Sequence, residues 1–335
     1  MERAGVSGLD SAQIWSISDG RAGNARQADA LAGALADALG GTARVLALAP
    51  RAPWRWFAPR TLPAADRAFG DAFAAALAAP PTLAIGCGRQ AGLATRLLHE
   101  RGAKSVQILD PRIDPSHWDL VIAPEHDGLS GGNILTLLGS LNPVDDAWLD
   151  RARLEFAPFA DLPAPRTALL VGGPMRHARF DAARFESVCG QLGRQVAQEG
   201  GCVLATTSRR TPPAIAGMLR QRLADTPGLA WCGADDGPNP YAGLLAWADR
   251  IVCSPDSINM ISEACATRTA VEVFDIEHTS GRQRRFLDAL LALGRIQPFG
   301  VGRPSASASP LRETRRIADA IRARLGLARA SIGTG

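Results

Sequence analysis

The sequence predicts an α/β protein built from two Rossmann-like domains that face each other across a cleft. The length and the pattern of apolar residues lead to this prediction. A chain of 335 residues suits about two domains of roughly 150 residues each. Short apolar runs alternate with longer Ala- and Leu-rich segments of helical period, which is typical of the βαβ units of a parallel sheet. The alternation ends near residue 123 and restarts near residue 167, so each half is expected to form its own sheet.

The predicted strands are the short apolar runs, and the predicted helices fill the gaps between them. In the first half we expect strands at 13–18, 43–48, 82–85, 105–109 and 120–123, and helices at 25–39, 64–77 and 90–101. In the second half we expect strands at 167–171, 202–206, 229–232, 250–253 and 270–274, and helices at 182–198, 214–224, 242–248, 258–266 and 281–292.

The expected domain boundary is a proline-rich segment, residues 156–165, with three prolines in ten residues. Proline removes a backbone donor and disfavours helix, so the segment is interpreted as a connector between a domain at 1–155 and a domain at 166–335. A second Ser/Pro/Gly-rich stretch, 300–310, precedes a final helix expected at 311–325.

Composition narrows the class of protein. The net charge of +4 is too small to predict a nucleic-acid binder. No run of 18 apolar residues predicts a membrane span, and the charged residues 1–13 do not resemble a secretory signal. The six cysteines lack metal-ligand spacing, so no metal site is predicted, and they suit free core thiols in a reducing cytoplasm.

In parallel α/β sheets, ligands bind beyond the carboxyl ends of the strands, so the loops there are the candidate sites. The first such loop contains Asp19, Gly20 and Gly23 before a helix. Its glycines allow close approach of a ligand to the backbone, and the helix N-terminus favours anions. Asp19 is a candidate general base. The alternative is an ordinary turn in which Asp19 caps the helix.

Two later loops of the first half also attract attention. Residues 86–91 fit the looser G-x-G-x-x-A dinucleotide pattern, but the pattern falls on a late βα unit, so it does not lead us to predict NAD(P). Glu125, His126 and Asp127 follow the fifth predicted strand. A histidine between two carboxylates suits acid–base catalysis, whereas the alternative is a solvated polar loop.

The second half carries a candidate anion site. Gly173 follows its first predicted strand, and Ser208, Arg209 and Arg210 follow the next one. Guanidinium groups bind phosphate oxygens in a bidentate manner, and hydroxyls add short hydrogen bonds. This combination predicts that a phosphate group binds here.

A further polar segment follows the strand at 250–253. Asp256 lies in the turn, a helix begins near Ser257, and Ser262 and Glu263 lie further along that helix. The positive end of the helix dipole can bind a diphosphate, and Glu263 can reach a ribose. Asn239 and Tyr241, which precede another helix, are candidates for framing a base. The alternative is a capped helix whose glutamate is solvated.

Taken together, these segments resemble the bacterial branch of the elongated-mitochondria fission family. The similarity runs from about residue 14 to 274. It is carried by the blocks 19–27, 86–90, 107–112, 123–127, 206–212, 239–241 and 256–265. Plant members of this family act on the mitochondrial outer surface and recruit a dynamin-type GTPase. The bacterial members have a GT-B-like fold without a firmly established activity.

The GT-B resemblance implies a division of labour. The C-terminal domain would hold a nucleoside-diphosphate sugar, with Glu263 on the ribose and the two serines near the diphosphate. Arg209 and Arg210 would neutralise the leaving diphosphate without a metal or a tightly bound cofactor. The N-terminal domain would hold the acceptor, and its base is either Asp19 or His126.

One segment resembles neither a core element nor a catalytic loop. It interleaves aromatic residues with arginines, namely Trp54, Trp56 and Phe57 with Arg51, Arg55 and Arg60. Such side chains suit the surface of an anionic inner membrane. The alternative is that the tryptophans pack beneath a loop.

Three functional hypotheses follow. The first is a glycosyltransferase that moves a sugar from a nucleoside-diphosphate donor to an envelope glycolipid or related lipid-linked acceptor. The second is a sugar-nucleotide epimerase or hydrolase of the same fold. The third is a non-catalytic protein that recruits a partner to a membrane surface.

Overall fold

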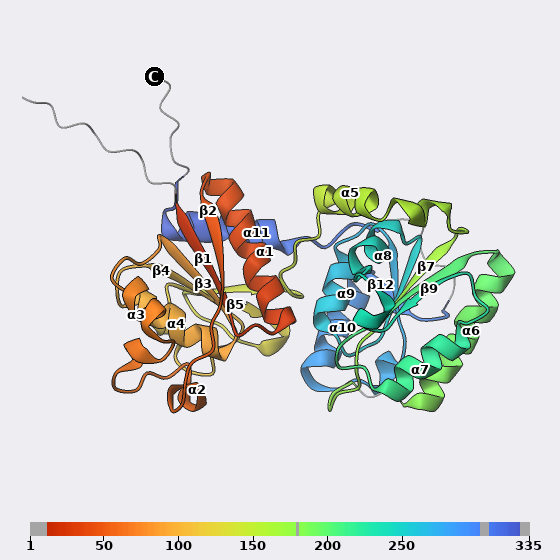
Figure 1. Cartoon of the computed structure of the whole chain (residues 1–335), viewed down its shortest axis with the longest axis horizontal. Helices are drawn as coiled ribbons and strands as arrows, with labels where there is room; N and C mark the ends of the chain where they lie inside the picture. Colours follow the sequence, from red (N-terminus) through yellow and green to blue (C-terminus); the bar gives the residue numbers. More distant parts are fainter. Residues whose placement is uncertain (1–11, 179–180, 302–307, 329–335) are drawn as a thin grey trace, which may run out of the picture. The chain divides into compact units, whose positions relative to one another are not determined.

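The structure is a computed structural model that describes residues 12–178, 181–301 and 308–328. Two predictions fall mainly on residues outside these ranges. They are the absence of a secretory signal at 1–13 and the Ser/Pro/Gly-rich stretch at 300–310. The chain forms two compact units (Figure 1). Unit 1 comprises Met1–Leu137, Leu141–Pro143 and Glu313–Gly335, and unit 2 comprises Leu138–Ser140 and Val144–Arg312.

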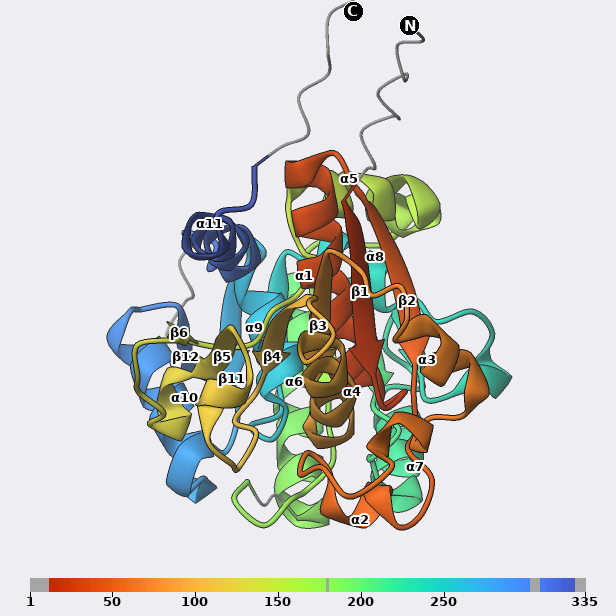
Figure 2. The same ribbon diagram turned by 90° about the vertical axis from the view of Figure 1, so that its left-hand side faces the viewer.

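Unit 1 is built on a six-stranded parallel sheet of order β2-β1-β3-β4-β5-β6 (Figure 2). The strands are β1 (Gln13–Ser18), β2 (Thr42–Ala47), β3 (Leu83–Cys87), β4 (Lys104–Ile108), β5 (Leu120–Pro124) and β6 (Ile134–Leu137). Its helices are α1 (Ala22–Leu39), α2 (Trp54–Phe57), α3 (Asp71–Ala76), α4 (Arg89–His99) and α11 (Glu313–Leu325).

Alternating residues of β1 define the two layers of unit 1. Ile14 packs in a cluster with the apolar faces of α1 and α11, whereas Trp15 packs in a cluster with α3 and α4. Because successive strand residues point to opposite faces, one short apolar strand supports both layers. The sheet is therefore covered by helices on both faces.

Unit 2 has the same plan, with a parallel sheet of order β12-β11-β10-β7-β8-β9. The strands are β7 (Arg166–Val171), β8 (Cys202–Thr207), β9 (Gly228–Trp231), β10 (Arg250–Cys253), β11 (Ala270–Val273) and β12 (Ile296–Pro298). The helices are α5 (Asp146–Glu155), α6 (Ala182–Glu199), α7 (Pro213–Arg222), α8 (Tyr241–Trp247), α9 (Ile258–Cys265) and α10 (Gly281–Ala292). Leu170 faces the cluster that contains α8, α9 and α10, and Leu169 faces α6 and α7.

Six short 3₁₀ helices complete the described elements. They are η1 (Ala65–Arg67), η2 (Pro115–His117), η3 (Glu125–Asp127), η4 (Ala157–Asp161), η5 (Ala234–Asp236) and η6 (Ile276–His278). None of the helices in the described ranges has the length and apolarity that crossing a membrane requires.

The structure corrects the predicted domain boundaries. The segment 156–165, predicted as a connector, lies within unit 2. Phe156 stacks on Phe159 and packs against Gly243 of α8, so aromatic packing outweighs the proline content. The final helix, predicted in the second domain, belongs to unit 1, because Ile317 and Ile321 join the core on the α1 face.

Most predicted strands agree with the structure to within one or two residues, and three differences stand out. The predicted helix 64–77 is divided into η1 and α3 by Gly70, whose φ of +90° no helix tolerates. The short edge strands β6 and β12 were not predicted, and neither was α5. The prediction of two parallel α/β sheets is confirmed.

Candidate functional site

The order of the strands locates the candidate site of unit 2. β7 lies between β10 and β8, so the chain order reverses at the carboxyl end of β7. Such a reversal is the point at which open α/β sheets bind ligands. Three loops meet there, those that follow β7, β8 and β10. They contain most of the residues that the sequence predicted to bind a nucleotide sugar.

The loop after β7 fits only glycine at its first two positions. A Cβ on Gly172 would lie 2.1 Å from Oδ2 of Asp256, and a Cβ on Gly173 would lie 2.2 Å from the carbonyl oxygen of Arg210. The amide of Gly172 donates to Oγ of Ser254 at 2.7 Å. These contacts bring the backbones of three loops close together.

Asp256 lies at the centre of this arrangement. Its side chain has no exposed surface. Its carboxylate accepts hydrogen bonds from the Gly173 amide at 2.9 Å, from Oγ of Ser254 at 2.6 Å and from Nη2 of Arg210 at 2.9 Å. Asp256 thus positions Arg210, whose side chain is half exposed, and contact of Asp256 itself with a ligand stays a prediction.

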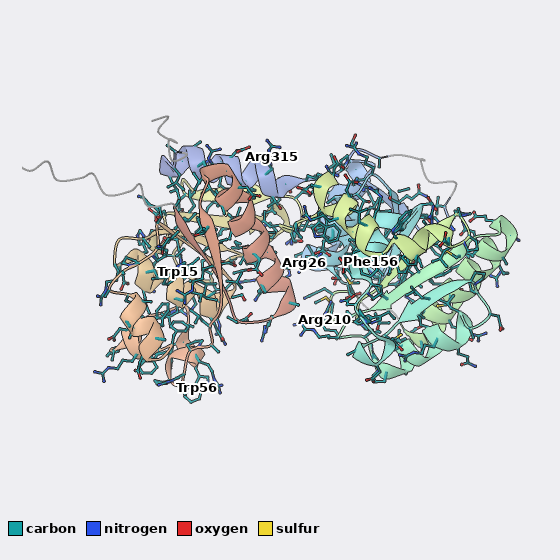
Figure 3. All side chains as sticks on the ribbon, turned by 45° about the horizontal axis from the view of Figure 1, so that its top comes forward. Trp15, Arg26, Trp56, Phe156, Arg210 and Arg315 are labelled. Atoms are coloured by element: carbon teal, nitrogen blue, oxygen red, sulfur yellow. The ribbon has the colours of Figure 1, made fainter. Side chains whose placement is uncertain are left out.

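The turn after β8 is held by hydroxyl groups. Oγ1 of Thr211 lies 2.5 Å from the carbonyl oxygen of Gly172 and accepts from the amide of Ser208 at 3.0 Å. Oγ of Ser208 accepts from the amide of Arg210 at 3.2 Å. The turn therefore has a defined shape and exposes the side chains of Arg209 and Arg210. Figure 3 labels Arg210. Thr211 is the residue here whose role the sequence analysis missed.

The two serines of the α9 segment have structural partners. Oγ of Ser257 caps α9 by accepting from the amide of Met260 at 3.3 Å. Ser262 is buried, and its Oγ accepts from the amide of Ser140 at 3.1 Å. A Cβ on Gly139 would lie 2.3 Å from the same hydroxyl oxygen. Ser257 is partly exposed beside the three loops, whereas Ser262 fastens a neighbouring segment to α9.

Glu263 and Tyr241 meet inside unit 2. The Tyr241 hydroxyl donates to Oε2 of Glu263 at 2.5 Å, and Glu263 is only 3% exposed. Oδ1 of Asn239 accepts from the Tyr241 amide at 3.0 Å and so shapes the start of α8. The structure thus joins three residues predicted around ribose and base, although contact with a ribose stays a prediction.

Unit 1 has its own reversal of strand order, between β1 and β3. Oδ1 of Asp19 accepts from Nδ2 of Asn24 at 3.1 Å and from the amide of Arg21 at 3.2 Å. Asn24 packs against Gly88, where a Cβ would lie 2.6 Å from its Nδ2. Gly20 has a φ of +76°, which glycine adopts without strain. Asp19, Gly20 and the loop after β3 are therefore assembled at one point, with Gly23 in the first turn of α1.

The loop after β4 carries the strained backbone of this sheet. Leu109 and Arg112 have φ values of +72° and +61°. The buried side chain of Gln107 donates from Nε2 to the carbonyl oxygens of Gly88 at 3.2 Å and of Ile108 at 2.8 Å. Such strain often accompanies functional sites. The sequence did not indicate the positive φ at Leu109, because leucine rarely adopts it.

The second base candidate lies elsewhere in unit 1. Glu125, His126 and Asp127 form η3 after β5, which is separated from β1 by β3 and β4. At a strand spacing of about 4.8 Å, roughly 14 Å separates the ends of β1 and β5. His126 is 7% exposed, whereas Glu125 is exposed. The structure therefore does not bring this trio together with Asp19.

The cysteine thiols near the two candidate sites are buried and unreactive. Burial raises the pKa of Cys265 to about 12 and also raises the pKa of Cys253. Burial, with the charge of Asp19 as a second cause, raises the pKa of Cys87. Thiols with raised pKa values stay protonated, so these cysteines are core residues.

Comparison with known proteins reveals the relationships of the chain. A family model described as mitochondrial fission ELM1 matches residues 22–325. The chain belongs to the ELM1 family. The mitochondrial fission protein ELM1 of Arabidopsis thaliana is 30% identical over 276 residues, which cover 73% of this chain and 64% of the relative. The chain thus spans just under two thirds of that relative's length.

Two further comparisons extend this family result. The uncharacterised protein RP120 of Rickettsia prowazekii is 24% identical over 285 residues, covering 72% of this chain and 79% of the relative. Among solved structures, the UDP-GlcNAc 2-epimerase of Methanocaldococcus jannaschii matches with a TM-score of 0.52 and 12% identity, covering 93% of this chain and 100% of that chain. At this identity the match concerns the fold. This ELM1-family chain has the GT-B-like fold that the sequence predicted.

Proposed function

We propose that this ELM1-family protein is a GT-B-type glycosyltransferase whose unit 2 binds a nucleoside-diphosphate sugar. The observation that carries the proposal is the pairing of Arg210 with the buried Asp256 at the point where the strand order of unit 2 reverses. A buried carboxylate that fixes an arginine leaves the exposed face of the guanidinium for an anionic ligand. Phosphate oxygens are the preferred bidentate partners of such a group.

The diphosphate is proposed to lie over the loops after β7 and β8. Gly172 and Gly173 have no side chains, which lets the loops that follow β8 and β10 pack directly against the loop after β7 and hold Arg210 at this point. Arg209, Arg210 and Ser208 surround the same point with positive charge and a hydroxyl. As the bond between the sugar and the diphosphate breaks, negative charge grows on the departing oxygens. Fixed donors at that point can stabilise the charge by several kcal/mol.

The acceptor is proposed to bind unit 1, with Asp19 taking the proton of its attacking hydroxyl. Of the two base candidates, Asp19 is favoured because it lies where the strand order of unit 1 reverses. An envelope glycolipid or related lipid-linked acceptor, reached from the cytoplasmic face of the membrane, is the proposed acceptor class.

The family relationship favours a second candidate, a non-catalytic recruiter. The Arabidopsis relative is named for mitochondrial fission, a process that does not itself imply sugar chemistry. In this case the loops of unit 2 would be remnants of a binding site or would serve as a sensor. An epimerase or hydrolase of the same fold would instead convert the donor without any acceptor.

Thermal unfolding in the presence of nucleotides tests the proposal. UDP, GDP, ADP, CMP and NAD(P) are each added at millimolar concentration to the full chain. A ligand at about 100 times its Kd stabilises the fold by about 2.7 kcal/mol, which shifts the unfolding temperature visibly. We expect one nucleoside diphosphate to act, and Arg210→Gln to abolish the shift. A shift with none of them would favour the recruiter.

Product analysis separates the catalytic alternatives. The donor identified by thermal unfolding is incubated with the protein, first alone and then with lipid extract. Conversion of the donor alone would identify an epimerase or hydrolase. Conversion only with the extract is the result that the glycosyltransferase proposal requires.

A further inference from the structure

The segment around α2 is basic. Residues 42–70 contain five arginines and one aspartate, a net charge of +4. This equals the net charge of the whole chain, so the other residues contribute 32 basic and 32 acidic side chains and are neutral together. The segment is therefore one of the basic stretches of the chain; another is 200–224, with four arginines and no acidic residue.

Within this segment the three aromatic residues of α2 point in different directions. Trp54 is held at its place by a hydrogen bond from Nε1 to the carbonyl oxygen of Pro63 at 3.2 Å, and it packs against the cluster around α3 and α4. Trp56 is 61% exposed and Phe57 is 49% exposed. Packing beneath a loop thus explains Trp54 alone, and Trp56 projects outward (Figure 3).

The exposed aromatic residues stand on a well-anchored backbone. The Arg51 amide donates to the carbonyl oxygen of Ala68 at 2.7 Å, and Ala58 directly after α2 is buried. Nη1 of Arg96 on α4 donates to the carbonyl oxygen of Pro59 at 3.2 Å. The exposure of Trp56 and Phe57 is thus built into the fold, at a cost in hydration that a binding surface would recover.

We propose that α2 is a docking surface for an anionic lipid bilayer. Trp56 and Phe57 would enter the interfacial region, and Arg51, Arg55 and Arg60, all exposed, would pair with lipid phosphates. The charge of the segment and the anionic bilayer are complementary. Neither aromatic anchoring nor charge alone gives lasting attachment, but the two signals together do.

The size of the surface favours a bilayer over a protein partner. Two partly exposed aromatic side chains offer on the order of 250 Å² of apolar area. A stable protein interface needs about 800 Å² on each partner, of which roughly 450 Å² is apolar. A bilayer has no such requirement, because insertion of a few side chains already binds reversibly.

The position of α2 links this surface to the chemistry of unit 1. Figure 2 shows α2 beyond the carboxyl ends of the strands of unit 1, the edge that also carries Asp19. A bilayer bound at α2 would therefore lie on the side of unit 1 from which a lipid-linked acceptor approaches Asp19. This last step rests on the proposed function, whereas the docking itself does not.

Vesicle sedimentation tests the docking. The full chain is mixed with vesicles of phosphatidylcholine alone or with 30% phosphatidylglycerol, at about 0.1 M salt. We expect binding to the anionic vesicles only. The double variant W56S/F57S should bind at least ten-fold more weakly. The double variant R55Q/R60Q should bind about 25-fold more weakly, because each arginine near an anionic surface contributes about a five-fold factor.

Two matched variants control for nonspecific effects. L154S removes an apolar side chain that is 81% exposed on α5 of unit 2, and R101Q/R315Q removes two other exposed arginines of unit 1. Both should sediment like the unchanged protein.

Equal loss in these controls, or no binding to anionic vesicles, would overturn the proposal. Self-association that W56S/F57S abolishes, without vesicle binding, would assign the surface to a second copy and would also overturn it. Nucleotide binding should be unchanged in every variant, so failure here and failure of the proposed function are distinguishable.

Discussion

Arg210 and Asp256 form an ion pair of which only one partner reaches solvent. Nη2 of Arg210 lies 2.9 Å from Oδ2 of Asp256, the carboxylate has no exposed surface, and the guanidinium side chain is 50% exposed. Asp256 thus makes these hydrogen bonds inside the fold. Through them it fixes the direction in which the Arg210 side chain faces solvent.

Replacing this aspartate should cost stability. Asp256→Asn puts an amide where three donors converge, so at least one buried donor loses its acceptor. We expect the free energy of unfolding to fall by about 2 kcal/mol. The loss is not larger, because Arg210 is half exposed and can turn to water. Urea unfolding measures the change. Asp150→Asn, which removes a carboxylate 71% exposed and paired with Arg153, should cost under about 0.5 kcal/mol. Equal losses in the two variants would refute the role of Asp256.

A glycine inside α1 offers a stabilising change. Gly33 lies within the helix, and a Cβ there would meet nothing within 4 Å. Gly33→Ala should raise the free energy of unfolding by about 0.5 to 1 kcal/mol, because alanine restricts the unfolded chain and favours helix. Gly86→Ala is the contrasting variant, since its Cβ would lie 2.8 Å from Cγ2 of Thr95. If both variants were destabilised alike, the packing described for α1 would be incorrect.

The pKa of Glu272 predicts a pH dependence of stability. Burial raises this pKa above its ordinary value of 4.5, since the side chain is almost fully enclosed. The folded protein therefore holds the proton more tightly than the unfolded chain does, and ionisation destabilises the fold as pH rises through this range. Glu272→Gln should be more stable than the unchanged protein at pH 7, and its advantage should shrink as pH falls toward 4.

Urea unfolding at pH 4, 5.5 and 7 measures this trend. Gln at position 272 keeps an oxygen for Nε2 of Gln297, which lies 3.2 Å from the carboxylate. Glu155→Gln, an exposed change on α5, should alter stability by under about 0.5 kcal/mol at each pH. An advantage of Glu272→Gln that grows toward low pH would have the opposite sign and would exclude this explanation.

The choice between the two base candidates can be made by kinetics. Asp19→Asn should lower the rate of sugar transfer by about 10²-fold to 10⁴-fold, as expected for loss of a general base. His126→Gln should retain most of the transfer activity, because it lies three strands away from Asp19. Asp37→Asn, on the exposed face of α1, is the control for the removal of a carboxylate from unit 1. Full activity of Asp19→Asn together with an inactive His126→Gln would reverse the assignment.

The sequence predicted the strands of both sheets well because each is a short continuous apolar run. It failed at residues 64–77, where alanines favour helix and Gly70 breaks it through a conformation that no apolar pattern records. It also missed β6 and β12, which are edge strands of four and three residues. Short edge strands bury little surface, so their periodicity is weak.

The candidate sites were predictable in composition but not in geometry. Polar residues after the strands identified loops that the structure places at the two reversals of strand order. The pairing of Gly172 with Ser254, 82 residues apart, depends on β10 lying beside β7, which the order of residues does not reveal. The same limit kept Asp19 and His126 equivalent until the strand order separated them. For the same reason the partners of Asp256 and Ser262 inside the fold were not predicted, and contact of either residue with a ligand stays a prediction.

Binding of a nucleoside diphosphate to two glycine variants tests whether the loops after β7, β8 and β10 form the diphosphate site. Gly172→Ala places a methyl group against the carboxylate of Asp256, whereas Gly217→Ala makes the same change in α7, where a Cβ meets nothing within 4 Å. Titration calorimetry with the diphosphate identified by thermal unfolding measures both affinities. We predict that Gly217→Ala binds like the unchanged protein and that Gly172→Ala binds at least ten-fold more weakly while remaining folded by circular dichroism. Equal affinity in the two variants would mean that the diphosphate binds away from the loops that Asp256 and Arg210 hold together.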